Sequence, residues 1–226
     1  MTEPLSQAQK AFHQRIMAAH VFTETEARAV WESLDDRTKF EAALKSCNAQ
    51  LRYAGLEISA VAMPTTTTHP KSDPDTDDDT PPTASPNRPN NHKALTKYYA
   101  MINTFPDEIA KVTFQRLWTP AEHALVRIWL ESLVENTFLS RASLINARSK
   151  LDAKLSLTLE QSQSLLNRLV DEAWLRESNQ GKNARPGSMQ AAIVLAPRTY
   201  LELSYMLMDE FGMDANELPQ QFKYME

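Results

Sequence analysis

Cysteine and glycine are scarce in this 226-residue sequence, which holds one cysteine, Cys47, and four glycines. A single cysteine excludes a disulfide within the chain and fits a reducing compartment, the cytosol or the nucleus. The glycine-rich GxGxxG and GxxxxGK[ST] phosphate-binding loops do not occur, and the GxSxG nucleophile motif is absent as well. The sequence therefore lacks the common signatures of nucleotide-binding proteins and serine hydrolases.

Long hydrophobic runs and a strong charge of one sign are also missing. No segment approaches the roughly 18 apolar residues of a membrane span, and the first ten residues do not resemble a signal peptide. The net charge is −5, of which residues 64–92 contribute −3, because this segment contains five aspartates and only two basic residues, Lys71 and Arg88. The near-neutral remainder does not attract nucleic acid in general, so DNA contact would need a local patch or a partner.

Candidates for catalysis or metal binding are few. Three of the five histidines fall on predicted helices without a second ligand at metal spacing, and the other two lie within residues 64–92. Cys47 lies on the core face of a predicted helix, where a buried, inert thiol is expected. Asp73–Asp77 resembles the start of a calcium loop, but Asp78 stands where that loop requires glycine. We predict no catalytic residue, no metal and no cofactor for this chain.

Residues 64–92 are the one low-complexity segment. They hold seven of the thirteen prolines, a threonine run and an acidic stretch, with no aliphatic residue larger than Ala84. Such a composition cannot bury enough apolar surface to offset the entropy of ordering, so the segment is predicted to be disordered.

The residues around this segment predict a first winged helix. Capping boxes at Ser6–Gln9 and Thr23–Glu26 open two helices, and a third helix ends at Gly55. Leu56–Met63 alternates like a strand, and Lys97–Asn103 is expected to return beside it. The predicted domain covers residues 1–63 plus 93–105, with the disordered residues 64–92 at the hairpin tip.

The second part of the chain predicts the same pattern again. Capping boxes at Thr119–Glu122 and Thr158–Gln161 open two of its helices, and Trp174–Glu177 and Ala192–Ala196 are expected to be strands. A last helix should run to Gly212. The predicted fold is mainly α with small β-hairpin wings, as tandem winged-helix domains. The second domain covers residues 119–212, and residues 213–226 form a tail.

Two predicted helices are apolar over more than the roughly 100° stripe of a surface helix: residues 121–134 and the last helix. Two interpretations stay open, namely packing between the two domains and contact with another protein. Large apolar and aromatic side chains dominate interface energies. Trp174 is expected in the core. The candidate partner anchors are Phe12, Met17, Trp129, Tyr200 and Tyr205.

The alternative function is that of a stand-alone winged-helix DNA-binding regulator. The third helix of the second domain is acidic, which disfavours phosphate contact. Weak candidates for contact with the DNA backbone are Lys45 and Arg52 in the first domain, and Lys182 and Arg185 in the second wing. A solvated helix face is the usual explanation for residues such as the first pair.

Three blocks of sequence resemble a known family. They are Gln9–Met17, Leu166–Leu175 and, most specifically, Leu195-Ala-Pro-Arg-Thr-Tyr-Leu-Glu-Leu203, which is close to an "LGPRxxxEL" pattern with Ala196 in place of glycine. The chain resembles the winged-helix region of non-structural maintenance of chromosomes element 1, the RING-bearing subunit of the SMC five–six complex, in a form similar to the fungal proteins. The resemblance covers essentially the whole chain outside residues 64–92.

This resemblance implies a scaffold that binds a MAGE-domain subunit (element 3), joined by a kleisin subunit (element 4). The trimer is expected to bind double-stranded DNA and to serve DNA repair and recombination after DNA damage in the nucleus, on chromatin. Relatives carry a zinc RING expected to act as a ubiquitin ligase, which needs eight Cys/His ligands. With one cysteine, this chain is expected to be inactive alone. Both a shortened piece of a longer protein and a short natural form fit the sequence.

Overall fold

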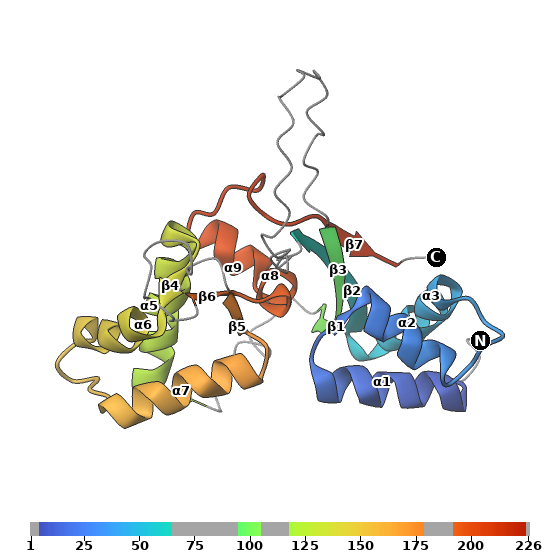
Figure 1. Cartoon of the computed structure of the whole chain (residues 1–226), viewed down its shortest axis with the longest axis horizontal. Coiled ribbons are helices and arrows are strands. Elements are labelled where there is room, and N and C mark those ends of the chain that lie inside the picture. The colour runs from blue at the N-terminus through green and yellow to red at the C-terminus, as the bar shows by residue number, and fades with distance from the viewer. Residues whose placement is uncertain (1–4, 65–94, 105–117, 179–191, 225–226) are drawn as a thin grey trace, which may run out of the picture.

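The protein is described by a computed structural model that covers residues 5–64, 95–104, 118–178 and 192–224. Helices dominate these residues, and the strands form two small antiparallel sheets, one in each half of the molecule (Figure 1). No helix in the described ranges combines the length and apolar character needed to cross a membrane. The mainly α architecture with small sheets agrees with the sequence prediction.

The N-terminal half, residues 5–104, begins with helices whose starts are set by local hydrogen bonds. Ser6 Oγ accepts from the Gln9 N–H at 3.2 Å, while Gln9 Oε1 accepts from the Ser6 N–H at 2.8 Å. Thr23 and Glu26 form the same reciprocal pair, so both predicted capping boxes are confirmed. The elements are α1 (Gln7–Ala19), β1 (Phe22–Thr23), α2 (Glu24–Glu32), α3 (Phe40–Leu51), η1 (Arg52–Ala54), β2 (Leu56–Pro64) and β3 (Leu95–Asn103).

The N-terminal sheet has the strand order β1-β3-β2-β7. The hairpin of β2 and β3 runs in register from Leu56↔Asn103 to Pro64↔Leu95, which confirms the predicted returning strand. Alternate residues of β2 face opposite sides: Ile58 and Ala60 join the helical core, whereas Val61 and Met63 join a second cluster on the other face. Both faces of β2 are therefore buried.

Aromatic side chains fill the N-terminal core. The ring of Phe12 meets those of Trp31 and Phe40 edge-on, with centroids 5.8 and 6.0 Å apart, and Phe40 meets Tyr99 at 5.4 Å. Edge-to-face contacts of this kind stabilise a core beyond the area that the rings bury. Trp31 is fixed further, because its indole N–H donates to the Thr38 carbonyl at 2.8 Å.

The C-terminal half, residues 118–212, repeats the order of elements. Thr119 and Thr158 open helices with the predicted capping boxes, and the predicted wing strands are present with ends shifted by one or two residues. Its sheet has the order β4-β6-β5. The elements are α5 (Pro120–Asn136), β4 (Leu139–Ser140), α6 (Arg141–Asn146), η2 (Ala147–Lys150), α7 (Leu159–Asp171), β5 (Leu175–Ser178), β6 (Ala192–Leu195), α8 (Pro197–Glu202) and α9 (Ser204–Asp209).

Leucines dominate the core of the C-terminal half, together with Trp129 and Trp174. Trp129 is fully buried, and its indole N–H donates to the Leu144 carbonyl at 2.6 Å. The predicted core position of Trp174 is confirmed, since its side chain is 6% exposed.

The last part of the chain differs from the prediction in two ways. The expected single helix to Gly212 is broken, because Leu203 departs from helical geometry (φ −109°, ψ 16°) between α8 and α9. The residues expected to be a tail include β7 (Gln221–Lys223), which pairs with β2 of the N-terminal half. The predicted disordered segment 64–92 lies outside the described residues, except for Pro64 at the end of β2.

Candidate partner surface and the joint between the halves

The two anchor candidates on α1 have different environments. Phe12 is 1% exposed in the N-terminal core, so its prediction as a partner anchor is wrong. Its ring is already occupied by contacts with Trp31 and Phe40. Met17 is 58% exposed, because five helical positions turn its side chain to another face of α1. Met17 therefore remains a candidate.

Trp129 is likewise a core residue and not an anchor, because it is fully buried within the C-terminal half. Most of the apolar surface of α5 packs against elements of the same half, including η2, β4, β6 and α9. The broad apolar surface of this helix thus results from packing within one domain, whereas the sequence suggested packing between domains or a partner. Between its two end residues, the exposed positions are charged: Arg127, Glu131 and Glu135.

The break between α8 and α9 separates the two remaining candidates. Tyr200, on α8, is partly buried against the cluster that joins the two halves. Tyr205, on α9, is 67% exposed, and Met208 one turn later is exposed as well. Residues three positions apart on a helix are neighbours, so Tyr205 and Met208 form a small apolar surface. We call these two residues the α9 patch.

Arg198, at the start of α8, connects the two halves. Its Nη1 donates to the Glu172 carbonyl at 2.8 Å and lies 3.3 Å from Nδ1 of His20 in the N-terminal half. Its Nε donates to Glu202 at 2.7 Å, and its guanidinium lies 4.1 Å from the ring centroid of Trp174. The planar, always charged guanidinium can make these contacts at once, which a lysine could not.

Burial and neighbouring charges shift the pKa values of the titratable groups at this joint. Burial raises the pKa of Glu202, and the neighbouring Arg198 opposes that rise. Burial and the charge of Arg198 lower the pKa of His20, with Glu172 acting in the opposite direction. Because guanidinium can only donate, the neutral imidazole of His20 must accept at Nδ1. Arg198 lies within the Leu195–Leu203 motif, and its pairing with Glu202 is local. Its other partners are distant in sequence, so no local pattern could assign them.

An apolar cluster completes the joint. Val61, Met63 and Ala100 of the N-terminal sheet are buried with Leu201 of α8. In Figure 1, α8 lies beside the β2–β3 hairpin, between the two groups of helices. The buried outer face of β2 is thus explained by α8, and the two halves share an apolar contact and a hydrogen-bonded one.

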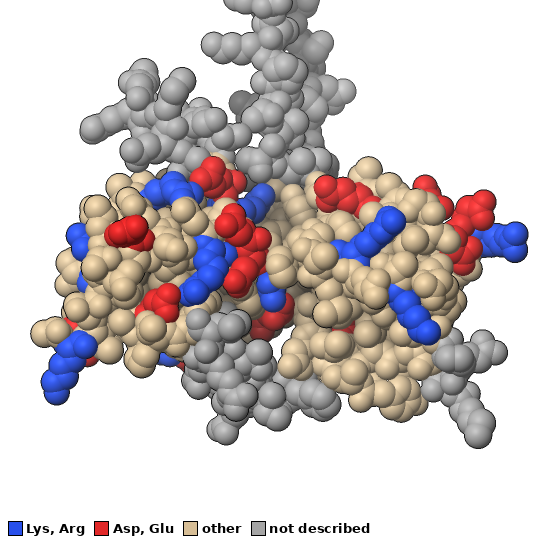
Figure 2. Space-filling view, turned by 90° about the horizontal axis from the view of Figure 1, so that it is seen from below, with Lys and Arg blue, Asp and Glu red and all other residues tan. Residues whose placement is uncertain are grey.

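Two of the four basic candidates lie in the described residues. Lys45 and Arg52 are exposed on α3 and η1, whereas Lys182 and Arg185 lie outside the described residues. On the face drawn in Figure 2, Lys and Arg side chains are interspersed with Asp and Glu. An interspersed surface gives little net attraction for a phosphate backbone.

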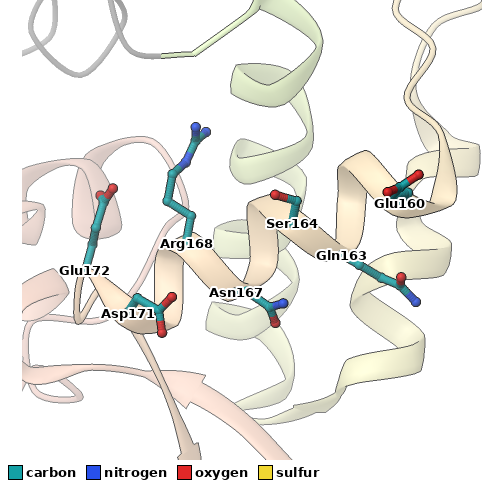
Figure 3. Close-up of a pocket in the computed structure, with 7 residues that line it drawn as sticks. All are labelled: Glu160, Gln163, Ser164, Asn167, Arg168, Asp171 and Glu172. Carbon is teal, nitrogen blue, oxygen red and sulfur yellow. The ribbon is translucent and has the colours of Figure 1, made fainter.

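The outer surface of α7 carries a shallow polar hollow. Figure 3 shows its side chains along the helix, with Arg168 and Glu172 pointing to the same side. Arg168 is engaged already: it forms an ion pair with Glu122 at 3.1 Å and lies over the ring of Trp118. The hollow is therefore predominantly acidic, in agreement with the sequence. It is lined by Glu160, Gln163, Ser164, Asn167, Arg168, Asp171 and Glu172.

The environments of Cys47 and the described histidines disfavour their ionised forms. Burial raises the pKa of the Cys47 thiol to about 12, so the thiol stays protonated at neutral pH. Burial lowers the pKa of His13 and of His123. Over the described ranges, no group of three or more His, Cys, Asp or Glu side chains is placed to hold a metal ion.

Sequence comparison identifies the family. Residues 9–156, about two thirds of the chain, match the family described as "Nse1 non-SMC component of SMC5-6 complex". The chain belongs to the Nse1 family. A chain of a solved structure titled "Nse1-Nse3-Nse4 complex" has a similar fold, with a TM-score of 0.62 at 18% identity, over 92% of this chain and 76% of that one. Comparison with curated proteins gave no match.

The Nse1 family match begins in α1 and ends beyond α6. It therefore includes most of the N-terminal half and the first helices of the C-terminal half. The structural similarity extends over nearly the whole chain. At 18% identity it supports the fold, and the family match supports membership of Nse1.

Proposed function

We propose that this protein is an assembly subunit of an SMC5-6 complex, which binds a MAGE-domain subunit and, with it, a kleisin subunit. Membership of the Nse1 family over residues 9–156 carries the proposal. The fold similarity to a chain of an Nse1-Nse3-Nse4 complex supports it, since that structure is named for three subunits in one assembly. The expected setting is the nucleus, on chromosomes, in DNA repair and recombination.

We further propose that the two halves are tandem winged helices. Each half has the same order of elements: helix, short strand, two helices and two antiparallel strands. In each, the short first strand pairs with the last strand of the hairpin. This order supports a duplicated domain plan, although the two sequences are not repeats of each other.

The partner surface that we propose includes Met17 on α1 and the α9 patch. These side chains are exposed and apolar, so covering them removes hydrophobic surface from water. Tyrosine is enriched among residues that dominate interface energies. Arg198 and the apolar joint connect the half that carries α1 to the half that carries α9.

We propose an assembly role and no catalytic step for the residues of this chain. A RING needs four Cys or His ligands for each of two zinc ions. The sequence has one cysteine, and Cys47 is fully buried in the N-terminal core, so the residues present do not fit such a site.

The proposal is tested by co-purifying the full chain with the MAGE-domain subunit of the same complex and measuring affinity by calorimetry. Tyr205→Ala should weaken binding about tenfold or more if Tyr205 is an anchor, and Met17→Ala should weaken it less. Tyr53→Ala is a matched control, because Tyr53 is a 77% exposed tyrosine on η1, outside α1 and α9. No binding by the unaltered chain would overturn the proposed function, and equal effects of Tyr205→Ala and Tyr53→Ala would overturn the surface.

Titration of double-stranded DNA into the isolated chain distinguishes a DNA-binding regulator from an assembly subunit. Affinity tighter than about 1 μM at ~150 mM salt, lost in Lys45→Ala with Arg52→Ala, would favour a DNA-binding regulator. Affinity weaker than that agrees with an assembly role in which the other subunits contribute to DNA contact.

A further inference from the structure

Residues 213–224, which we call the C-terminal segment, contact the cores of both halves. Met213 is buried in the leucine-rich core of the C-terminal half, and Leu218 packs against the same core. Phe222 and Tyr224 pack instead against the aromatic core of the N-terminal half. Only three residues separate Leu218 from Phe222, so the chain passes from one core to the other over a short distance.

Backbone pairing fixes the end of this segment. β7 pairs antiparallel with β2, with Val61 opposite Gln221 and Ser59 opposite Lys223. The Ala62 N–H donates to the Gln220 carbonyl at 2.9 Å. Figure 1 shows β7 beside the hairpin of β2 and β3, and an irregular connection from α9 leads to it. Without β7, β2 would be an open sheet edge with unpaired backbone groups.

Side chains reinforce the pairing. The Tyr224 hydroxyl lies 2.9 Å from that of Tyr99, and the two rings stack with centroids 5.8 Å apart. The buried amide of Asn48 donates to the carbonyls of Ile58 and Tyr224, at 2.9 and 3.2 Å, and accepts from the Ile58 N–H at 2.8 Å. One buried side chain of α3 therefore holds β2 and the end of the C-terminal segment together.

The same segment also reaches the joint. The Gln221 side chain donates to the Tyr200 carbonyl at 2.8 Å, which links β7 to α8. Its neighbour Phe222 lies under the ammonium group of Lys97, 4.6 Å from the ring centroid. The segment thus contacts β2, β3, α3 and α8, which belong to both halves.

We propose that the C-terminal segment is a strap that fixes the orientation of the two halves, and hence the arrangement of α1 relative to α9. The apolar joint at Leu201 has four buried residues and Arg198 adds hydrogen bonds beside it, so the strap is a third connection that opposes rotation of one half against the other. Because the paired strand has only three residues, the strap can detach locally while each half stays folded. Its release would free the halves to move and expose the edge of β2.

Pulsed electron paramagnetic resonance of the full chain tests this proposal. Spin labels attached to Ala42→Cys on α3 and Ser164→Cys on α7 report the distance between the halves. Both positions are exposed, and Cys47 is buried and protonated. The unaltered strap should give a narrow distance distribution. Phe222→Ala combined with Tyr224→Ala should broaden it at least twofold. Lys223→Ala, an exposed position between the two, should leave it unchanged.

Hydrogen exchange keeps the test independent of global unfolding. In the double variant, the Ala62 amide should exchange about tenfold faster or more, while amides of α5 in the C-terminal core should keep their rates. Single Phe222→Ala provides a milder variant if the double variant unfolds. Faster Ala62 exchange with an unchanged distance distribution would overturn the strap, because it would show that the joint alone fixes the orientation. The result does not depend on a MAGE-domain partner and so is separate from the proposed function.

Discussion

The two halves have the same order of helices and strands, but their cores are built differently. The N-terminal core is aromatic and takes Phe222 and Tyr224 from the other end of the chain. The C-terminal core is rich in leucine and is formed within residues 118–218. One sequence pattern can therefore be stabilised either by residues close in sequence or by a distant strand. The C-terminal segment adds side chains to the N-terminal core, whereas no described residue of the N-terminal half is part of the leucine-rich core.

The largest effects are expected from two buried tryptophans, one in each half. Trp31 and Trp129 are both buried on a helix, and each donates its indole N–H to a carbonyl. Alanine at either position should lower the free energy of unfolding by about 3–5 kcal/mol. Urea unfolding monitored by circular dichroism checks this. If both variants show one coincident transition, the halves unfold together; two separate transitions would indicate that the strap and joint couple them weakly.

Removal of the Asn48 amide should lower the free energy of unfolding nearly as much. Asn48→Ala would leave backbone groups of Ile58 and Tyr224 without this partner, so we expect a loss of about 2–3 kcal/mol. The exposed Asn146→Ala serves as a control and should change stability by less than about 0.5 kcal/mol. A loss below about 1 kcal/mol for Asn48→Ala would contradict its role at the base of the strap.

Arg198→Met should lower the free energy of unfolding by about 1–3 kcal/mol. Arg198→Lys should lower it less, because lysine keeps the charge but not the planar guanidinium. The effect depends on pH through Glu202. Burial raises the folded-state pKa of this carboxyl, so its ionisation opposes folding as pH rises above the unfolded pKa, and Arg198 offsets that cost. The loss in Arg198→Met should therefore be larger at pH 7 than at pH 4, measured by urea unfolding. A loss independent of pH would show that Arg198 acts only through the Glu172 carbonyl and Trp174.

The smallest change concerns the end of α7. Ala173 adopts a left-handed conformation, with φ 59°, and Trp174 N–H bonds to the Leu169 carbonyl as in a Schellman cap. Ala173→Gly should raise the free energy of unfolding by about 0.5–1 kcal/mol, because glycine adopts positive φ without steric cost. Ala29→Gly inside α2 should lower it by a similar amount. Equal signs for the two changes would contradict this explanation.

The elements were predictable where their causes are local. All four capping boxes link a side chain to a backbone group three residues away, so the pattern itself contains both partners. The partner surface was less predictable. Phe12 and Met17 look equally apolar in sequence, yet only Met17 is exposed, because the core that covers Phe12 is assembled from α2 and α3. Polar and aromatic residues alternate in Gln221-Phe-Lys-Tyr224, a pattern typical of a strand. The sequence prediction nevertheless assigned these residues to a tail.

The sequence alone determined the mainly α composition, the starts of the helices and the absence of a zinc-ligand set, since these depend on residue type and on spacing of a few positions. Tertiary structure decided which apolar residues are exposed, which face of β2 meets α8, and that Arg198 joins His20 to Glu172 across the two halves. It also placed Tyr224 against Tyr99 and Asn48. These contacts bring together residues far apart in the chain, and their energy exists only once both halves have folded.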